Sequence, residues 1–342
     1  MKQNYHSKVT TKLYSLLRIN NHPVVRVYNG FGNGEKCLLY GHVLNISPYP
    51  RKKFRNNIIV NVLSLIRLFF VSPMPGVKVT LEWEGETFEA TTEKDGLFKF
   101  EWPTGNIASG EYVVNVVMWE GRNKVASGSG KVFVPLKNRF TFISDIDDTF
   151  LVSHSSTLLK RLYVILTENA YTRKPFDGVV AHYQMLEKAG AKQGEHNPFF
   201  YVSSSEWNLY EYITHFLIKN KLPQGVLLLN QIKTIDKILQ TGKNNHGSKF
   251  VRIVRIIEAF PDQQFVLLGD DTQRDPYIYE SITSHFPDKV FAVYIRKVGK
   301  KHKPEVMAQL EKIAARNIII HYFGSSAMAL DHWNKYGPVQ ES

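Results

Sequence analysis

Three aspartates follow a short apolar run near the middle of the chain. Residues 140–144 read Phe-Thr-Phe-Ile-Ser, and Asp145, Asp147 and Asp148 come directly after them. Clustered carboxylates repel one another and lose hydration on burial, so a buried strand seldom ends this way unless a cation binds there. One nucleophilic aspartate with a second two positions later is also a way to build an aspartyl-phosphate enzyme. The pattern therefore predicts phosphoryl-transfer chemistry at Asp145 and Asp147.

Further polar residues stand at the ends of predicted strands or at the start of a predicted helix. They are Ser203, Lys249, Asp270, Asp271 and Asp275. Several carboxylates at adjacent strand ends form an oxygen-only site that suits Mg²⁺. A serine hydroxyl can hydrogen-bond a phosphoryl oxygen, and a lysine can neutralise phosphate charge and restrain the carboxylates. A lone serine or lysine is usually structural, and an acidic strand end alone can be a calcium site or a helix cap. Four such elements in this order favour catalysis.

The elements that position these residues alternate in type after Pro135. Apolar runs typical of buried strands are separated by segments with helical periodicity. The predicted strands are Phe140–Ile146, Phe199–Ser203, Val226–Leu229, Phe265–Gly269 and Val290–Ile295. This alternation predicts an α/β fold with a doubly wound parallel sheet over residues 137–342, and such sheets bind ligands at the carboxyl ends of their strands.

A different pattern precedes this region. Residues 23–136 contain seven short runs rich in β-forming residues, separated by turn signals, and they predict an antiparallel β-sandwich. The run Gly30–Gly34 contains three glycines but does not match a dinucleotide-binding fingerprint, so we expect a plain hairpin turn there. Residues 1–22 form a basic, amphipathic N-terminal segment with no continuous apolar core typical of a signal peptide.

Length and composition limit the number of domains, the disulfide content and the kinds of partner that the chain can have. A chain of 342 residues is expected to form two domains, and its single cysteine, Cys37, excludes an internal disulfide framework. A reducing, cytoplasmic location fits this composition. The net charge is +12, and residues 1–75 hold eleven Lys/Arg but only one acidic residue. This asymmetry indicates an anionic partner, either nucleic acid or an acidic membrane surface, or else simply a soluble basic surface.

One insertion in the predicted sandwich combines basic and apolar residues. Residues 51–55 read Arg-Lys-Lys-Phe-Arg, and residues 58–71 are apolar apart from a polar stripe at every third position. Fourteen residues are too few to span a bilayer. The insertion 51–71 is therefore either a membrane-surface element or a helix that packs on its own domain.

Taken together, the motifs resemble the haloacid dehalogenase superfamily. Its four motifs correspond to Asp145/Asp147/Thr149, Ser203, Lys249 and Gly269-Asp270 with Asp275. The resemblance is closest to the actin-patch-associated phosphatidate phosphatase family. The segments that carry it are Ser-Asp-Ile-Asp-Asp-Thr at 144–149, residues 201–210, residues 269–279 and Tyr294-Ile295-Arg296.

This resemblance implies a mechanism and a fold. Asp145 would be the nucleophile and Asp147 the general acid and base. Asp145, the backbone carbonyl of Asp147 and Asp270 would hold Mg²⁺, with Asp271 or Asp275 as a further or supporting ligand. The fold would be a Rossmann-like sheet of haloacid dehalogenase type. Its caps would be small, because residues 151–174 and 230–247 are too short for a full cap domain.

The sequence thus predicts a Mg²⁺-dependent phosphoric monoester hydrolase that acts on phosphatidate at a membrane surface. The basic residues from Arg296 to Lys303 follow the last predicted strand, and they either bind a second anionic group or form a solvated loop. Two alternative functions stay open: a phosphatase for a soluble or macromolecular ester, and a non-catalytic membrane-binding adaptor. No nucleic-acid-binding motif is present, so we expect an anionic lipid rather than a nucleic acid as partner.

Overall fold

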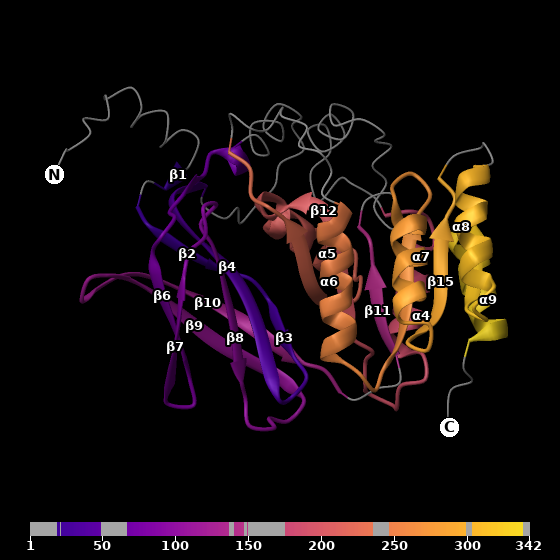
Figure 1. Cartoon of the computed structure of the whole chain (residues 1–342), viewed down its shortest axis with the longest axis horizontal. Coiled ribbons are helices and arrows are strands. Elements are labelled where there is room, and N and C mark those ends of the chain that lie inside the picture. The colour runs from indigo at the N-terminus through magenta and orange to yellow at the C-terminus, as the bar shows by residue number, and fades with distance from the viewer. Residues whose placement is uncertain are drawn as a thin grey trace.

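The computed structural model describes residues 19–20, 22–48, 67–136, 140–146, 149, 175–234, 246–298 and 303–337. These residues form a β-rich region from the first part of the chain and an α/β region from the second, packed side by side (Figure 1). The predicted fold class is confirmed at this level.

Six parallel strands form the sheet of the α/β region, in the order β13-β12-β11-β14-β15-β16. Their bounds are β11 Phe140–Ser144, β12 Phe199–Glu206, β13 Gly225–Asn230, β14 Gln264–Asp270, β15 Val290–Arg296 and β16 Ile319–Phe323. The chain builds outward from β11 in one direction, then returns to β14 on the other side of β11 and builds outward again. In open α/β sheets ligands bind at this reversal of strand order, which here places the site between the carboxyl ends of β11 and β14.

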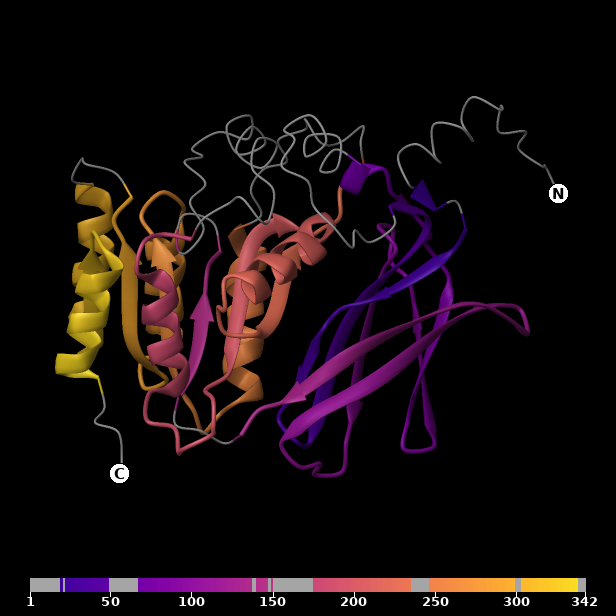
Figure 2. The same cartoon turned by 180° about the vertical axis from the view of Figure 1, so that it is seen from behind.

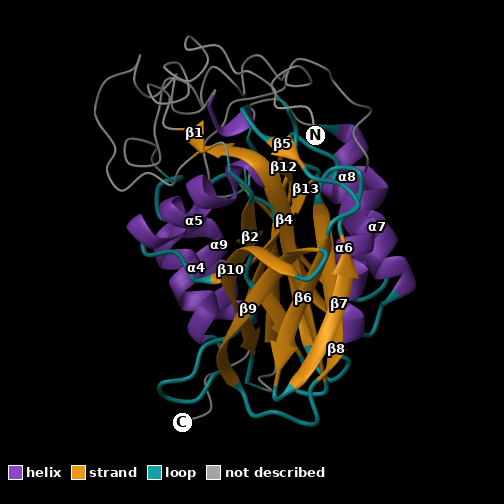
Figure 3. Cartoon of the chain, turned by 90° about the vertical axis from the view of Figure 1, so that its left-hand side faces the viewer, coloured by secondary structure: helices purple, strands orange, loops and turns teal. Residues whose placement is uncertain are grey.

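Helices cover both faces of the parallel sheet. Helices α4, α5 and α9 lie on one face and α6, α7 and α8 on the other (Figure 3), and α4 and α9 lie in front of the strands in the reverse view (Figure 2). Their bounds are α4 Val179–Lys188, α5 Tyr210–Lys219, α6 His246–Ala259, α7 Asp275–His285, α8 Pro304–Ala314 and α9 Ser326–Tyr336. Because both faces are covered, every residue of β11 is buried, and its sequence is nearly continuously apolar.

The β-rich region is a ten-stranded, mainly antiparallel arrangement in which β10 pairs with β3 in parallel. Its strands are β1 Ile19–Asn20, β2 Val24–Val27, β3 Gly30–Gly32, β4 Lys36–Pro48, β5 Ser72–Pro73, β6 Lys78–Trp83, β7 Glu86–Thr91, β8 Leu97–Pro103, β9 Gly110–Glu120 and β10 Asn123–Val134. Strand β8 shows the expected alternation, with Phe98, Phe100 and Trp102 buried in the core of this region.

The run Gly30–Gly34 is not only a turn. Gly30–Gly32 form strand β3 between β4 and β10, and the turn to β4 follows at Asn33, whose side chain accepts from two backbone amides. A Cβ at Gly30 would lie 2.3 Å from the Leu38 carbonyl oxygen. The predicted hairpin turn is present between β3 and β4, but the first three residues of the run form a strand, where the glycines allow close backbone approach within the sheet.

Aromatic contacts join the two regions. Tyr28 stacks on Trp207 with ring centroids 4.2 Å apart, and the Tyr210 hydroxyl accepts from the backbone amide of Asn29 at 2.9 Å. Trp207 belongs to the short helix η2 (Trp207–Leu209), directly after β12. The β-rich region therefore packs close to one end of a strand that the sequence assigns to the active site.

The insertion 51–71 is described only from residue 67 onward. Its last part forms the short helix η1 (Arg67–Phe69), in which Arg67 and Phe69 are buried, and the Leu68 carbonyl accepts from Asn208 Nδ2 at 2.9 Å. Residues 67–71 thus pack on the protein itself. Residues 51–66, like the N-terminal segment 1–18, lie outside the described residues. No helix in the described ranges is long and apolar enough to span a bilayer.

Candidate active site

The site is built where β11 and β14 end side by side. Asp145 follows β11 directly, and its backbone amide donates to the Leu268 carbonyl of β14 at 2.8 Å. Asp270 is the last residue of β14. Parallel pairing thus fixes both residues at one edge of the sheet.

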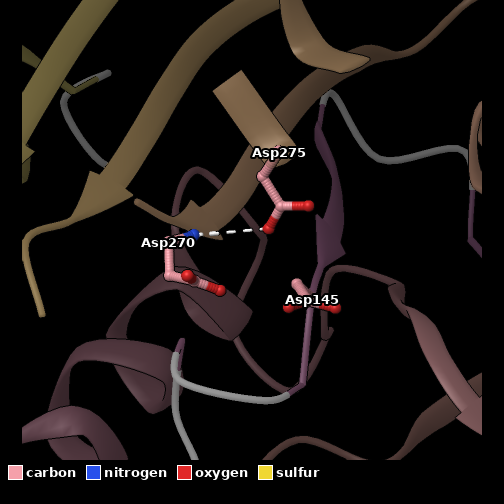
Figure 4. Close-up of side chains that lie close together, drawn as sticks. All are labelled: Asp145, Asp270 and Asp275. Atoms are coloured by element: carbon pink, nitrogen blue, oxygen red, sulfur yellow. Dashed lines mark hydrogen bonds between the residues drawn. The ribbon is translucent and has the colours of Figure 1, made fainter. Parts of the chain in front are cut away.

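Three aspartates converge at this edge. Asp145, Asp270 and Asp275 each offer a carboxylate oxygen, and these oxygens lie within 4.8 Å of one another (Figure 4). All three residues are fully buried. Burial, and then the neighbouring Asp275, raise the pKa of Asp270 to about 7, although hydrogen bonds from Thr272 oppose the rise. A cation near Asp270 would favour its charged form.

Lys249 supplies part of that charge. It lies in the first turn of α6, and its ammonium is 2.9 Å from Asp145 Oδ1 and also contacts Asp275 Oδ1. Burial by itself lowers the pKa of Lys249, but the two carboxylates outweigh this and hold the pKa above its usual value. The site thus holds more acidic groups than basic ones, and this composition suits the binding of a further cation.

Asp275 joins the elements of the site together. It is the first residue of α7, and its Oδ2 accepts from the Asp270 amide at 3.3 Å. A Cβ at Gly269 would lie 2.6 Å from Asp275 Oδ2 and 2.9 Å from the Tyr279 ring. Only glycine at position 269 allows the start of α7 to come this close to β14.

Gln273 is a site residue that the sequence reasoning missed. Its Nε2 donates to Asp145 Oδ2 at 3.0 Å, and its backbone amide donates to Asp270 Oδ1 at 3.1 Å. Thr272 adds a backbone donor and a hydroxyl donor to the same Asp270 oxygen, each at 2.5 Å. The available signal was the position of Gln273 in the loop between two predicted site aspartates.

Ser203 lies in β12, next to β11 in the sheet, and is fully buried. Its hydroxyl oxygen accepts from the Ser205 amide at 2.9 Å, and a hydroxyl that accepts one bond can still donate its own hydrogen. The Ser203 carbonyl accepts from Arg252 at 2.9 Å, which ties this strand end to α6. The structure gives Ser203 no direct contact with the aspartate trio.

Asp271 does not join the trio. Its Oδ1 accepts from the Val298 amide at 3.1 Å and lies 3.2 Å from the Lys303 ammonium, and its Oδ2 accepts from the Tyr322 hydroxyl at 2.8 Å. Its carboxylate therefore holds the segment after β15 instead of facing the cluster. Its place among the predicted metal ligands stays a prediction, but the structure sets it apart from the other aspartates: successive residues at a strand end point to opposite sides, so Asp270 and Asp271 diverge.

Asp147 and Asp148 lie outside the described residues, and their roles stay predictions. The next residue, Thr149, is described: it is buried, and its hydroxyl lies 3.4 Å from Asp270 Oδ2. Thr149, the end of the acidic turn 145–149, thus lies against the aspartate trio formed by Asp145, Asp270 and Asp275.

Arg296 differs from its predicted surface role. The sequence groups it with the basic residues up to Lys303, but it is buried, with 3% of its surface exposed. Its Nε and Nη2 donate to groups of the protein, the Thr149 carbonyl and the Ser326 hydroxyl.

Comparison with known proteins agrees with the motifs. Residues 140–297 match the model of the family described as "Phosphatidate phosphatase APP1, catalytic domain", which is the family that the motifs resemble. The phosphatidate phosphatase APP1 of Saccharomyces cerevisiae is 26% identical over 179 residues, which are 50% of this chain and 29% of the yeast protein. An uncharacterized protein of Schizosaccharomyces pombe is 21% identical over 164 residues, 47% of this chain and 26% of that protein.

Both yeast relatives are thus matched over less than a third of their own length. Solved structures are far less similar. A carbohydrate acetylesterase of Xanthomonas citri has a TM-score of 0.27 and 12% identity over 86% of this chain and 75% of that one. A β-glucuronidase of Ruminococcus gnavus has a TM-score of 0.28 and 10% identity over 89% of this chain and 53% of that one. These scores are too low to relate the folds.

Proposed function

We propose that this chain, whose residues 140–297 belong to the family of phosphatidate phosphatase APP1 catalytic domains, is a phosphatase that hydrolyses phosphatidate to diacylglycerol and phosphate. The observation that carries this proposal is the buried aspartate trio beside Lys249, at the reversal of strand order. The choice of phosphatidate as the substrate comes from the name of the yeast relative. We further propose that the α/β region is a Rossmann-like domain of haloacid dehalogenase type and that the β-rich region is a sandwich.

The donor set fits Mg²⁺. It contains carboxylate oxygens and neither histidine nor cysteine, and hard cations such as Mg²⁺ prefer oxygen ligands completed by water and substrate phosphate. Asp145 and Asp270 would hold the ion. Asp275 is already engaged by Lys249 and by the Asp270 amide, so its role would be to support the other two. Bound Mg²⁺ would neutralise phosphoryl charge and orient the phosphate.

The proposed reaction has two steps. In the first, a carboxylate oxygen of Asp145 bonds to phosphorus while the ester P–O bond breaks, and Asp147 gives its proton to the departing diacylglycerol oxygen. In the second, Asp147 takes a proton from water as the water oxygen bonds to phosphorus, and the bond to Asp145 breaks to release phosphate.

Other residues serve this reaction by charge and position. Lys249 pairs with Asp145 and adds positive charge next to the phosphoryl group. Gln273 orients the second oxygen of Asp145 by donating to it. The Ser203 hydroxyl, on the neighbouring strand, would donate to a phosphoryl oxygen.

The substrate is a membrane lipid, so the protein has to work at a bilayer surface. We propose that it is cytoplasmic and binds membranes peripherally through the basic residues 51–55 of the insertion. Electrostatic attraction to anionic lipids is worth about 1 kcal/mol for each Lys or Arg near the surface.

Phosphate release from phosphatidate in mixed micelles, with and without Mg²⁺, tests the proposal. A panel of soluble phosphate esters should be measured in parallel, together with Asp145→Asn as the inactive control. We expect Mg²⁺-dependent release from phosphatidate that the control lacks. Good turnover of soluble esters with inert phosphatidate would favour a soluble-ester phosphatase, and no release from any ester would favour an adaptor.

A further inference from the structure

Arg296 is a buried cation that contacts Thr149, the described residue at the end of the acidic turn 145–149. It is the last residue of β15 and pairs with Asp270 of β14 in the sheet register. Its side chain is enclosed although the sequence places it at the start of a basic run. A guanidinium removed from water is costly unless its hydrogen-bond donors are used, so its contacts indicate what it does.

The guanidinium joins three segments of the chain. Its Nε donates to the Thr149 carbonyl at 2.7 Å, and its Nη2 donates to the Ser326 hydroxyl at 2.7 Å. It also lies over the rings of Phe176 and Phe323, 4.5 and 4.9 Å from their centroids. These contacts fix the plane of the guanidinium, because a planar fork held by two hydrogen bonds and stacked on rings cannot rotate.

Thr149 marks the far end of the turn that carries Asp147. The near end is fixed by the bond from the Asp145 amide to the Leu268 carbonyl of β14. Between these two anchors lie only three residues, with Asp147 in the middle. Asp147 is therefore only two residues from an anchored residue on each side.

We propose that Arg296 is a positioning residue for the acid–base step: by holding the Thr149 carbonyl, it anchors the chain two residues after Asp147, the proposed acid and base. This inference rests on the proposed function, in which Asp147 gives and takes the proton. The contact with Phe176 extends the same restraint to the chain just after residues 150–174. A displacement of about 1 Å at a reacting group costs roughly 10²-fold in rate, so such an anchor matters.

A competing role for Arg296 is to join α9 to the sheet, since Ser326 lies in the first turn of α9. The two roles use different donors. Ser326→Ala removes the bond to α9 and keeps the bond from Nε to Thr149. Arg296→Gln removes both. Arg296→Lys keeps the charge but offers a single donor group in place of the fork.

Steady-state kinetics on phosphatidate separates these roles. We expect Arg296→Gln to lower kcat about 10- to 100-fold, which is typical of losing a residue that orients a group of the active site. KM should change less than about threefold. Arg296→Lys should recover only part of the loss, and Ser326→Ala should stay within about threefold of wild type. Arg316→Gln is the matched control, because Arg316 also donates to a carbonyl and a side chain, but on α7 and α8. An unchanged kcat in Arg296→Gln, or an equal loss in Ser326→Ala, would overturn the inference.

Hydrogen exchange gives a second readout that does not depend on activity. In Arg296→Gln, the peptide covering residues 142–149 should exchange faster, while α7 and α8 keep wild-type protection. Equal loss of protection in all three would mean that Arg296 is merely part of the core. Failure of the proposed function would instead appear in the wild type, as absence of phosphate release. In that case the exchange data alone decide whether Arg296 holds the turn.

Discussion

Lys249 Nζ lies 2.9 Å from Asp145 Oδ1, and the same ammonium contacts Asp275 Oδ1. The lysine thus bridges the proposed nucleophile and the residue that anchors α7. All three side chains are at least 96% buried. A buried ion pair of this kind contributes little net stability by itself, but breaking it leaves uncompensated charge in a low-dielectric interior.

Replacing Lys249 by methionine should therefore destabilise the protein as well as inactivate it. We expect the free energy of unfolding in EDTA to fall by about 3–5 kcal/mol, because the aspartates lose their internal cation. Mg²⁺ should restore part of this loss by supplying positive charge. Denaturant unfolding with and without Mg²⁺ measures both effects. Lys303→Met is the matched control: Lys303 pairs with Asp271 but is 36% exposed, so the expected loss is about 1 kcal/mol or less. Equal losses in the two variants would contradict the central role of Lys249.

The two-step reaction predicts different defects for its two carboxylates. Asp145→Asn and Asp147→Asn should each abolish turnover of phosphatidate and leave the fold intact. With an aryl phosphate, whose leaving group needs no proton, Asp147→Asn should still form the aspartyl-phosphate but hydrolyse it slowly. Intact-protein mass spectrometry should then detect one added phosphoryl group in Asp147→Asn and none in Asp145→Asn. Turnover of phosphatidate by either variant, or phosphorylation of Asp145→Asn, would refute this mechanism.

Asp270 and Asp271 are neighbours with different environments, so they make a matched pair. Asp270→Asn should weaken Mg²⁺ binding roughly tenfold or more, because Asp270 belongs to the aspartate trio. Asp271→Asn should change Mg²⁺ affinity by less than about threefold, because its oxygens contact Val298, Lys303 and Tyr322 instead. Calorimetric titration with Mg²⁺ compares them. Equal losses would restore Asp271 to the ligand set.

Most of this site could be predicted from the sequence because strand ends and motif order are local features. Asp145 directly follows β11, and Ser203, Lys249 and Asp270 stand at the predicted positions on β12, α6 and β14. Gln273 could not be assigned, because its contact with Asp145 spans 128 residues and depends on how the loop after β14 folds back.

Three features of the fold could not be predicted from the sequence for similar reasons. Strand β16 was not predicted because it is an edge strand, half-buried, with His321 inside its apolar run. Arg296 was assigned to a basic surface because charge runs are usually solvated, and only the fold shows that its partners Thr149 and Ser326 enclose it. The contact between Tyr28 and Trp207 joins two distant segments and has no local signal.

The stability of the metal-free protein should depend on pH through Asp270. Its pKa is about 7 when folded, raised first by burial and then by Asp275, against an ordinary value of 3.8. Between these values the folded state binds more protons than the unfolded state, so stability falls as pH rises from about 4 to about 7. We expect this loss, on the order of a few kcal/mol, in EDTA but not in saturating Mg²⁺. Thermal unfolding across this pH range measures it, with Asp270→Asn as the control in which the difference between EDTA and Mg²⁺ largely disappears. If the stability of the wild type in EDTA rose over this pH range relative to that of Asp270→Asn, the raised pKa of Asp270 would be contradicted.

Membrane binding through the insertion should depend on its basic residues. Neutralising Arg51, Lys52, Lys53 and Arg55 should weaken sedimentation with liposomes that contain phosphatidate, because each lost cation removes about 1 kcal/mol of attraction. High salt should weaken binding of the wild type in the same way, since exposed charges are screened over about 10 Å at 0.1 M. Activity on phosphatidate in liposomes should fall with binding. Activity on a soluble ester should stay unchanged, because none of these residues belongs to the described site.

A second variant separates this local effect from net charge. Neutralising four other basic residues, Lys94, Arg122, Lys124 and Lys188, gives the same net charge from exposed positions outside the insertion. We expect this control to bind liposomes more tightly than the insertion variant. If both variants bind like wild type, the insertion packs on the protein along its whole length, as residues 67–71 do. If both lose binding equally, the general basic charge of the chain attracts the membrane and residues 51–55 have no special role.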